Sequence, residues 1–211
     1  MKKNKFTFID FFSGVGGFRI PAEKFGGKCI GFSEIDQSAI SVYEDNFNND
    51  NESPLGDITN LNKLPKADVY FGGVPCQAWS VAGKKLGFED PRGKLWEDTI
   101  RVTAINKPKV FIYENVKGLL DPRNRSSLDL ILSEFNKAGY KTYYSLLNAY
   151  DFGLPQNRDR IFIVGIRKDI ATEPFMFPKP FEHENNLSTI IDELPSKRNK
   201  KKSFQPKDLF G

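Results

Sequence analysis

The chain has 211 residues, of which 39% are hydrophobic and 27% are charged, and its formal net charge is +4. This composition is typical of a globular domain, and the absence of any apolar stretch of membrane-spanning length argues against a membrane protein. Its two cysteines, Cys29 and Cys76, lie far apart, which argues against a disulfide framework and indicates a reducing compartment. We therefore expect a cytoplasmic protein, and the positive charge favours a polyanionic partner.

Short apolar runs alternate with amphipathic segments from residue 6 to about residue 167. This alternation predicts repeated βαβ units, and hence an α/β fold with a mainly parallel sheet and helices on both faces. Strands are expected at residues 6–12, 28–33, 68–71, 110–113, 142–147 and 161–166. Helices are expected near residues 18–25, 38–47, 95–105 and 127–138.

The character of the sequence changes after Lys168, where five prolines between residues 174 and 206 break any long element. This change predicts a domain edge near residue 170. Residues 171–211 are expected to be a linker or an incomplete second unit with one short helix near residues 190–194. A basic cluster between Lys197 and Lys202 is either a solvated tail or a phosphate contact.

A glycine-rich turn follows the first expected strand, with glycine at three of the positions 14–17. Such glycines permit positive φ and a close approach of a ligand to the backbone. The second expected strand ends at Glu34, whose carboxylate is able to accept hydrogen bonds from ribose hydroxyls. Asp57 and Ile58 add a polar and an apolar side chain, expected at the next strand edge. Together these residues suit an adenosine moiety, whereas the turn alone is equally typical of a tight βα connection.

Cys76 follows a strongly apolar segment, and Glu114 and Asn115 follow the next such segment. The arrangement indicates a thiolate nucleophile with a carboxyl group beside it. For Cys76 taken alone, a small buried core cysteine explains the residue equally well.

Four short segments carry a distinctive combination of residues: FIDFFSGVGG at residues 8–17, VPCQ at 74–77, YENV at 113–116 and QNRDR at 156–160. In this order and at these separations they resemble the motifs of the DNA (cytosine-5)-methyltransferases of bacterial restriction–modification systems. The resemblance covers roughly residues 6 to 168. It implies a Rossmann-like, S-adenosylmethionine-dependent methyltransferase fold, with residues 1–170 as the catalytic domain.

The resemblance implies covalent catalysis on a cytosine that has been flipped out of duplex DNA, because a stacked base is out of reach. Cys76 would attack carbon 6 of the ring and activate carbon 5. Glu114 would hydrogen-bond N3 and the exocyclic amine, and Arg160 would hold the carbonyl oxygen. Arg158 is expected to bind backbone phosphates, and a structural ion pair is the alternative for either arginine.

The matched positions also nominate a site for S-adenosylmethionine, in which Phe12 and Ile35 would flank the adenine and Glu34 would bind the ribose. The expected cofactor-binding residues are Phe12, Gly14, Val15, Gly17, Glu34, Ile35, Asp57, Ile58, Gly73, Pro75 and Leu95. Ile35 departs from the aromatic residue that related sequences often carry, and this change is expected to weaken stacking on adenine. No metal is expected.

A mobile loop after the nucleophile is the expected place of further DNA contacts, and a surface loop without such a role is the alternative. The residues expected to bind DNA are Gln77, Ser80, Lys84 and Lys85, in addition to Arg158. Gly83 and Gly87 would be pliable points of that loop.

The family resembled here continues with a target-recognition region and two closing motifs, and nothing between residues 170 and 211 matches them. The expected partner is double-stranded DNA. The chain is expected to be either a truncated product or one subunit of a split enzyme whose second subunit carries the recognition region. An inactive methyltransferase-like module that binds S-adenosylmethionine or a protein is the alternative. An RNA-methylating enzyme is a weaker third hypothesis, because resemblance to that branch would imply Pro-Pro-Cys at the position where this chain has Val-Pro-Cys.

Overall fold

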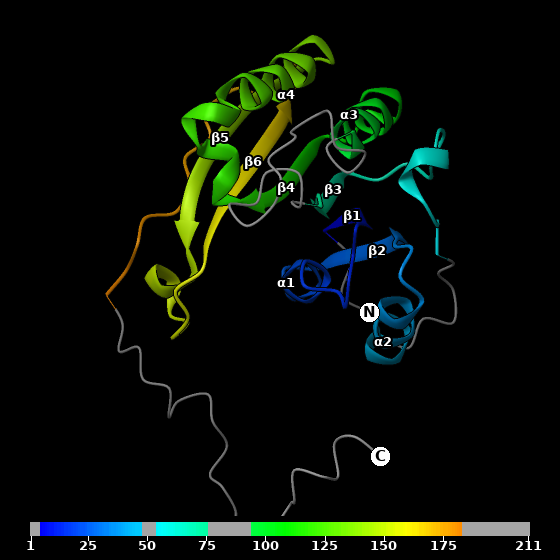
Figure 1. Cartoon of the computed structure of the whole chain (residues 1–211). Coiled ribbons are helices and arrows are strands. Elements are labelled where there is room, and N and C mark those ends of the chain that lie inside the picture. Colours follow the sequence, from blue (N-terminus) through cyan, green and yellow to red (C-terminus); the bar gives the residue numbers. More distant parts are fainter. Residues whose placement is uncertain (1–4, 48–53, 76–93, 183–211) are drawn as a thin grey trace, which may run out of the picture.

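The computed structural model describes residues 5–47, 54–75 and 94–182. In these ranges six strands form one sheet in the order β2-β1-β3-β4-β6-β5 (Figure 1). The strands are β1 (Phe6–Phe11), β2 (Gly27–Ser33), β3 (Val69–Gly73), β4 (Val110–Val116), β5 (Tyr140–Asn148) and β6 (Asp159–Arg167). Strands β1 to β4 run parallel to one another, whereas β6 is antiparallel to both β4 and β5. The expected mainly parallel sheet is confirmed.

Four α-helices cover the two faces of this sheet: α1 (Arg19–Lys24), α2 (Gln37–Phe47), α3 (Leu95–Asn106) and α4 (Arg125–Lys137). Their bounds agree with the expected helices to within two residues. None of the helices in the described ranges is long and apolar enough to cross a membrane.

Side chains of β1 alternate between the two faces, as a strand buried on both sides requires. Ile9 and Phe11 belong to the larger core, which the sheet forms with α3 and α4. Rings dominate this core: the Phe111 ring centroid lies 4.3 Å from that of Phe135 and 4.9 Å from that of Tyr113. Such aromatic packing gives the strands a rigid base on which to carry a site.

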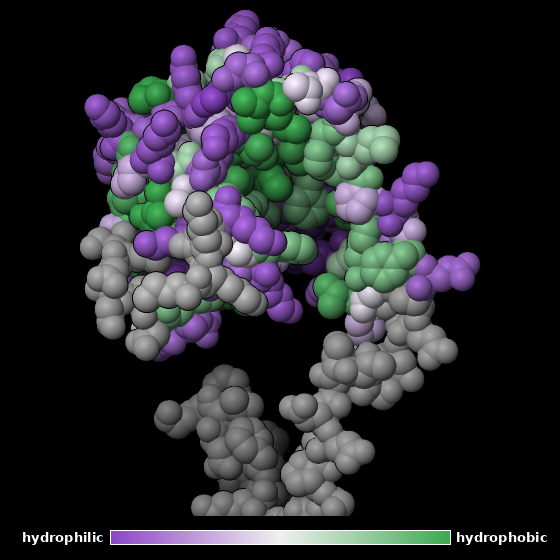
Figure 2. Space-filling model, turned by 180° about the vertical axis from the view of Figure 1, so that it is seen from behind, coloured by the Kyte–Doolittle hydropathy of each residue, from purple (hydrophilic) through white to green (hydrophobic). Residues whose placement is uncertain are grey.

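The opposite face of the sheet is covered by α1 and α2 over β1 and β2. Phe8 and Ala22 pack together under α1, while Phe32 stacks on Tyr43 of α2 at a centroid distance of 4.2 Å. The same face continues over β4, β6 and β5, where it borders a cavity. Figure 2 shows the molecule from behind. Hydrophobic side chains gather in the upper part of this face and are bordered by hydrophilic ones.

The segment between α2 and β3 differs from its expected form. Asp57 was expected at a strand edge, and this is wrong: among the described residues of this segment, β-pairing is limited to a single bridge between Phe32 and Pro54. Gly56 has φ of +79°, and Asp57 then caps a 3₁₀ helix, η1 (Ile58–Asn60), by accepting a hydrogen bond from the Thr59 amide at 2.9 Å. Asp57 has the side chain of a good N-cap, and that local bond competes with strand pairing.

The residues that follow β6 form no helix or strand in the described range 171–182. They nevertheless pack on the domain, because the Phe175 ring lies 5.8 Å from that of Tyr143 and the Phe181 amide donates to the Asp151 carbonyl. The domain edge near residue 170 stays a prediction. The short helix expected near residues 190–194 and the basic cluster after it lie outside the described residues.

Candidate active site

The carboxyl ends of β1, β2, β3 and β4 meet at one edge of the sheet, because these strands are parallel. The chain leaves β1 for β2 on one side and later returns to β3 on the other side, so the strand order reverses beside β1. Ligands of open α/β sheets bind at such a reversal. The residues predicted at strand ends are therefore brought together here.

The turn after β1 is built from unusual backbone conformations. Gly14 and Gly16 have φ of +53° and +94°, and Phe12, which is not glycine, has φ of +50°. A Cβ atom at Gly16 would overlap the ring of Phe47, so this position requires glycine for both reasons. Gly17 was expected to share the positive φ, and this is wrong: it does not lie in that region, because the chain is already entering α1.

Glu34 ties the end of β2 to this turn. Its Oε2 accepts a hydrogen bond from the Gly14 amide at 3.0 Å, and its Oε1 accepts from the amides of Ile35 and Asp36 at 2.8 and 3.0 Å. Three amide donors thus fix the orientation of one carboxylate, as ligand recognition requires.

A first cavity of about 330 Å³ opens beside Glu34. It is lined by Phe12, Ser33, Glu34, Ile35, Asp57, Ile58, Gly73, Pro75 and Leu95. The predicted cofactor residues converge here from five separate segments, with three exceptions. Gly14 lies behind Glu34, Val15 is 53% exposed, and Gly17 lines a different cavity.

Asp10 lies just before the glycine-rich turn and is fully buried. Among the described residues neither of its carboxylate oxygens has a hydrogen-bond partner. Burial raises the pKa of Asp10 to about 8, partly opposed by Arg19 and reinforced by Glu34. The carboxyl group is therefore mostly protonated at neutral pH.

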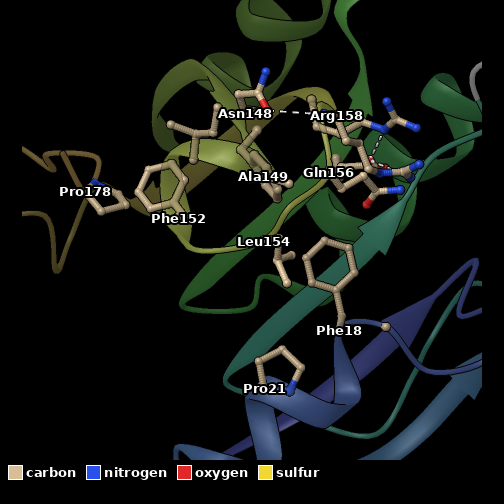
Figure 3. A pocket seen from close by; sticks show the side chains of 14 residues that line it. Phe18, Pro21, Asn148, Ala149, Phe152, Leu154, Gln156, Arg158 and Pro178 are labelled. Carbon is tan, nitrogen blue, oxygen red and sulfur yellow. Dashed lines mark hydrogen bonds and ion pairs between the residues drawn. The ribbon is translucent and has the colours of Figure 1, made fainter. Parts of the chain in front are cut away.

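A second cavity of about 670 Å³ lies between α1 and the face of β4, β5 and β6. Phe18 and Pro21 stand on one side of it, and Ala149, Phe152 and Leu154 on the other (Figure 3). The wall also includes polar and charged residues: Glu114, Asn148, Gln156, Arg158 and Arg160. A mostly apolar cleft with a few convergent polar groups is the usual form of a small-molecule or base site.

Glu114 and two arginines form the charged part of the second cavity. Glu114 Oε1 lies 2.6 Å from Arg160 Nε and 3.8 Å from the terminal nitrogen of Arg158. Arg160 also donates to the Asp159 carbonyl at 2.8 Å. The side chain of Arg158 is 49% exposed against 24% for Arg160, so Arg158 is the more available of the two for an external anion.

The two cavities are neighbours across one pair of strands. Gly73, which lines the first cavity, is the register partner of Glu114, which lines the second. A Cβ atom at Gly73 would lie 3.5 Å from Glu114 Oε2, so the carboxylate lies close to a residue that lines the first cavity. Groups bound in the two cavities would meet at this point.

Asn115 positions the chain that leads to Cys76. Its side chain is buried, and its Nδ2 donates to the Val74 carbonyl at 3.1 Å. Pro75 is the last described residue before Cys76. The predicted nucleophile and the predicted DNA contacts Gln77, Ser80, Lys84 and Lys85 lie outside the described residues, as do Gly83 and Gly87.

Sequence reasoning missed several residues of both cavities. Ser33 had a signal, because it directly precedes Glu34 at a strand end; its hydroxyl donates to the Gly56 carbonyl at 2.6 Å. Leu147 and Phe162 had none, since they become cavity walls only through the pairing of β5 with β6, and neither had Phe152, which lies in the connection between these two strands.

The fold and the paired cavities define a Rossmann-like methyltransferase domain. The model of the C-5 cytosine-specific DNA methylase family matches residues 6–210. The chain belongs to this family, and the family resemblance of its four motifs is confirmed.

Relatives of known name support the same assignment. The type II methyltransferase M.HgiCII of Herpetosiphon aurantiacus is 54% identical over 191 residues, which are 90% of this chain and 44% of the relative. The type II methyltransferase M.HhaI of Haemophilus parahaemolyticus is 42% identical over 189 residues, which are 89% of this chain and 56% of the relative. The chain thus spans about half the length of the curated relatives it matches.

The structure of a mutant of DNMT2 from Spodoptera frugiperda superposes with a TM-score of 0.70 at 25% sequence identity. The superposition covers 90% of this chain and 60% of the other. The described residues therefore share the fold of that structure.

Proposed function

We propose that this chain carries the catalytic site of an enzyme that transfers a methyl group from S-adenosylmethionine to carbon 5 of cytosine in double-stranded DNA. The observation that carries the proposal is the place of Glu114. It is paired with Arg160 in the second cavity and lies close to Gly73, which lines the first cavity. A base in one cavity and a methyl donor in the other would come into contact there.

The first cavity fits the adenosine part of S-adenosylmethionine. Phe12, Ile35 and Ile58 offer apolar surface for adenine. Glu34 uses its two oxygens on three backbone amides, and a carboxylate has about four lone-pair sites, so it is able to accept a ribose hydroxyl as well. The cofactor supplies an electrophilic methyl group bonded to a sulfonium sulfur.

The chain's own residues activate the base. The sulfur of Cys76 is proposed to form a bond to carbon 6 of cytosine, which makes carbon 5 nucleophilic. Glu114 is proposed to hold N3 and the exocyclic amine while charge develops in the ring. Arg160, fixed beside Glu114, is proposed to donate to the carbonyl oxygen. The ion pair of Glu114 and Arg160 keeps both groups oriented before the base arrives.

Methyl transfer and release of the enzyme are proposed to follow. Carbon 5 bonds to the methyl carbon as the methyl–sulfur bond breaks, and S-adenosylhomocysteine is the second product. A base then removes the proton from carbon 5, the ring double bond reforms, and the bond from carbon 6 to Cys76 breaks, which regenerates the thiolate.

DNA is proposed to reach the second cavity as a flipped base, with Arg158 on the backbone phosphates. The relatives are about twice as long as the chain. We infer that protein corresponding to their remaining part, in the same polypeptide or in a second chain, supplies the contacts that read the target sequence. Since those relatives are named type II methyltransferases, we propose a role in a restriction–modification system.

The test is covalent trapping on duplex DNA that contains 5-fluorocytosine, in the presence of S-adenosylmethionine. After methyl transfer carbon 5 carries fluorine in place of a removable proton, so the protein stays attached. A denaturant-resistant adduct is expected for the wild type and is expected to disappear in Cys76→Ser. The assay is run with the 211-residue chain and with that chain joined to the part of M.HgiCII that it does not span.

Absence of an adduct in both forms would contradict the catalytic proposal. Binding of S-adenosylmethionine without any adduct would favour the inactive binding module. An adduct that persists in Cys76→Ser would remove Cys76 from its proposed role.

A further inference from the structure

We infer that Arg101 is a positioning residue for the cofactor cavity, acting through the 3₁₀ helix η1. The inference rests on the proposed use of the first cavity for S-adenosylmethionine. Arg101 does not line that cavity. It holds the segment that carries Asp57 and Ile58 into the cavity wall.

The η1 segment is too short to hold its own position. It has three residues, and only the bonds from the Asn60 amide to Asp57 and from the Leu61 amide to Ile58 close it. Single helical turns are unstable in isolation because nucleation costs more entropy than one hydrogen bond returns. The placement of this wall must therefore come from contacts outside the segment.

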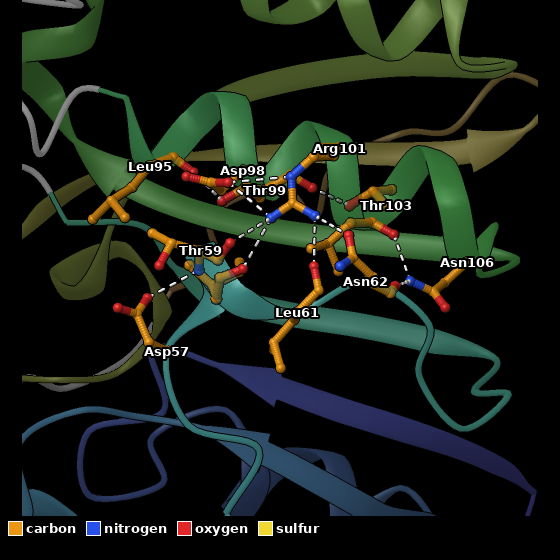
Figure 4. Close-up of polar contacts among 12 residues, drawn as sticks. Asp57, Thr59, Leu61, Asn62, Leu95, Asp98, Thr99, Arg101, Thr103 and Asn106 are labelled. Carbon is orange, nitrogen blue, oxygen red and sulfur yellow. Dashed lines mark hydrogen bonds and ion pairs between the residues drawn. The ribbon is translucent and has the colours of Figure 1, made fainter.

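Arg101 of α3 supplies those contacts through a fork of hydrogen bonds (Figure 4). One terminal nitrogen donates to the Leu61 carbonyl and to Asn62 Oδ1, the latter at 2.9 Å. The other terminal nitrogen donates to the carbonyls of Ile58 and Thr59, both at 3.2 Å. One guanidinium thus engages four acceptors along η1 and its end, including carbonyls that a helix terminus leaves without internal partners.

Asp98 fixes the guanidinium from the other side. Its Oδ1 lies 2.8 Å from a terminal nitrogen of Arg101 and 3.2 Å from Nε. The side chains of Arg101 and Asp98 are 33% and 24% exposed, so the pair is partly shielded from water. A held, planar fork makes these bonds with little loss of side-chain freedom, which a flexible lysine would not match.

The same helix carries Leu95, which lines the first cavity opposite η1. Thr99, one turn later, bonds to the Leu95 carbonyl at 2.7 Å. Helix α3 therefore supplies one wall directly and holds another through Arg101. Asn106 extends this attachment, because its Nδ2 donates to the Asn62 carbonyl and its Oδ1 accepts from the Leu64 amide.

The test compares cofactor binding with global stability in variants of the full chain. Arg101→Ala is expected to raise the calorimetric Kd for S-adenosylmethionine about tenfold or more, since several charge-assisted bonds are lost. Arg101→Lys keeps the charge but not the fork, and an intermediate Kd is expected. In any form active on DNA, KM for the cofactor should rise in Arg101→Ala while kcat at saturation stays within about twofold.

Hydrogen exchange provides a second readout that needs no cofactor. Amides of residues 59–61 are expected to exchange faster in Arg101→Ala, while those in α4 stay protected. Arg125→Ala is the matched control, because Arg125 also pairs with an aspartate on its own helix, Asp129 at 3.0 Å, and lines neither cavity. Its Kd is expected to equal that of the wild type.

If Arg101→Ala does not fold, Arg101→Lys and Asp98→Asn carry the test with the same expectation of a raised Kd. If the wild type binds S-adenosylmethionine and the folded variants bind it with the same Kd, the inference about Arg101 is overturned while the proposed cofactor site stands. Failure of the wild type to bind S-adenosylmethionine would overturn the proposed cofactor site and this inference together.

Discussion

At the scale of single residues, Asp10 is an ionisable side chain that is fully buried within an apolar strand. The sequence places it inside the apolar run of β1, where it is able to lie on either face of the sheet. Its burial follows from the helices packed over that face, and this burial raises its pKa to about 8 although the nearby Arg19 guanidinium acts to lower it. A buried carboxyl group without hydrogen-bond partners among the described residues resists ionisation.

This burial predicts a pH dependence of stability. The pKa of Asp10 rises from 3.8 to about 8 on folding, so between these values the folded state binds a proton that the unfolded state has released. The contribution of Asp10 to stability is therefore complete below about pH 4, declines as pH rises, and is lost above about pH 8. Asp10→Asn removes this titration. The free energy of unfolding of the variant, relative to that of the wild type, should therefore increase from pH 5 to pH 8. Urea unfolding at intervals of about one pH unit measures this difference.

Asp129→Asn is the control for that series, since Asp129 is 55% exposed and should give a difference from wild type that hardly changes with pH. A pH-independent difference for Asp10→Asn as well would show that Asp10 titrates alike in the folded and unfolded states.

At the scale of elements, the glycine-rich turn shows what a local pattern predicts and what it leaves open. Three glycines predict a tight turn after β1, and that turn is present. The pattern does not say which glycine is indispensable, because each looks alike in sequence. Packing of Phe47 from α2 against Gly16 makes the distinction.

A series of alanine substitutions should separate the three positions. Gly17→Ala should be nearly neutral, because φ is not positive and no atom lies within 4 Å of the new Cβ. Gly14→Ala has the same free space but φ of +53°, and should cost about 1 kcal/mol. Gly16→Ala adds overlap with Phe47 to a positive φ and should cost about 2 kcal/mol or more.

Urea unfolding of the three variants measures these costs. Equal destabilisation by all three substitutions would contradict the described turn. A larger effect at Gly17 than at Gly16 would contradict it in the same way.

At the scale of the whole molecule, the net charge of +4 and the charged end of the second cavity both bear on DNA. Arg158 directly precedes β6 and is half exposed at that end, while Arg167 is the last residue of β6 and is paired with Asp169 at 2.7 Å. An arginine thus stands at each end of β6, and of these two only Arg158 lines the second cavity.

If Arg158 binds a phosphate, Arg158→Ala should weaken binding to all duplex sequences and lower the slope of log K against log salt concentration by about 1. Fluorescence anisotropy between about 50 and 200 mM salt measures that slope. Arg167→Ala, its counterpart at the far edge, should leave the slope unchanged. An unchanged slope in Arg158→Ala would favour the structural ion pair with Glu114.

The sequence by itself determined the order of elements, the glycine-rich turn, the carboxylates at strand ends and the family motifs, because each depends on residues close together along the chain. Tertiary structure alone decided that Glu114 pairs with Arg160 beside Gly73, that Arg101 holds η1, and that Asp10 is buried. These properties depend on neighbours from distant segments, since desolvation and hydrogen-bond partners arise only when the sheet and its helices pack together.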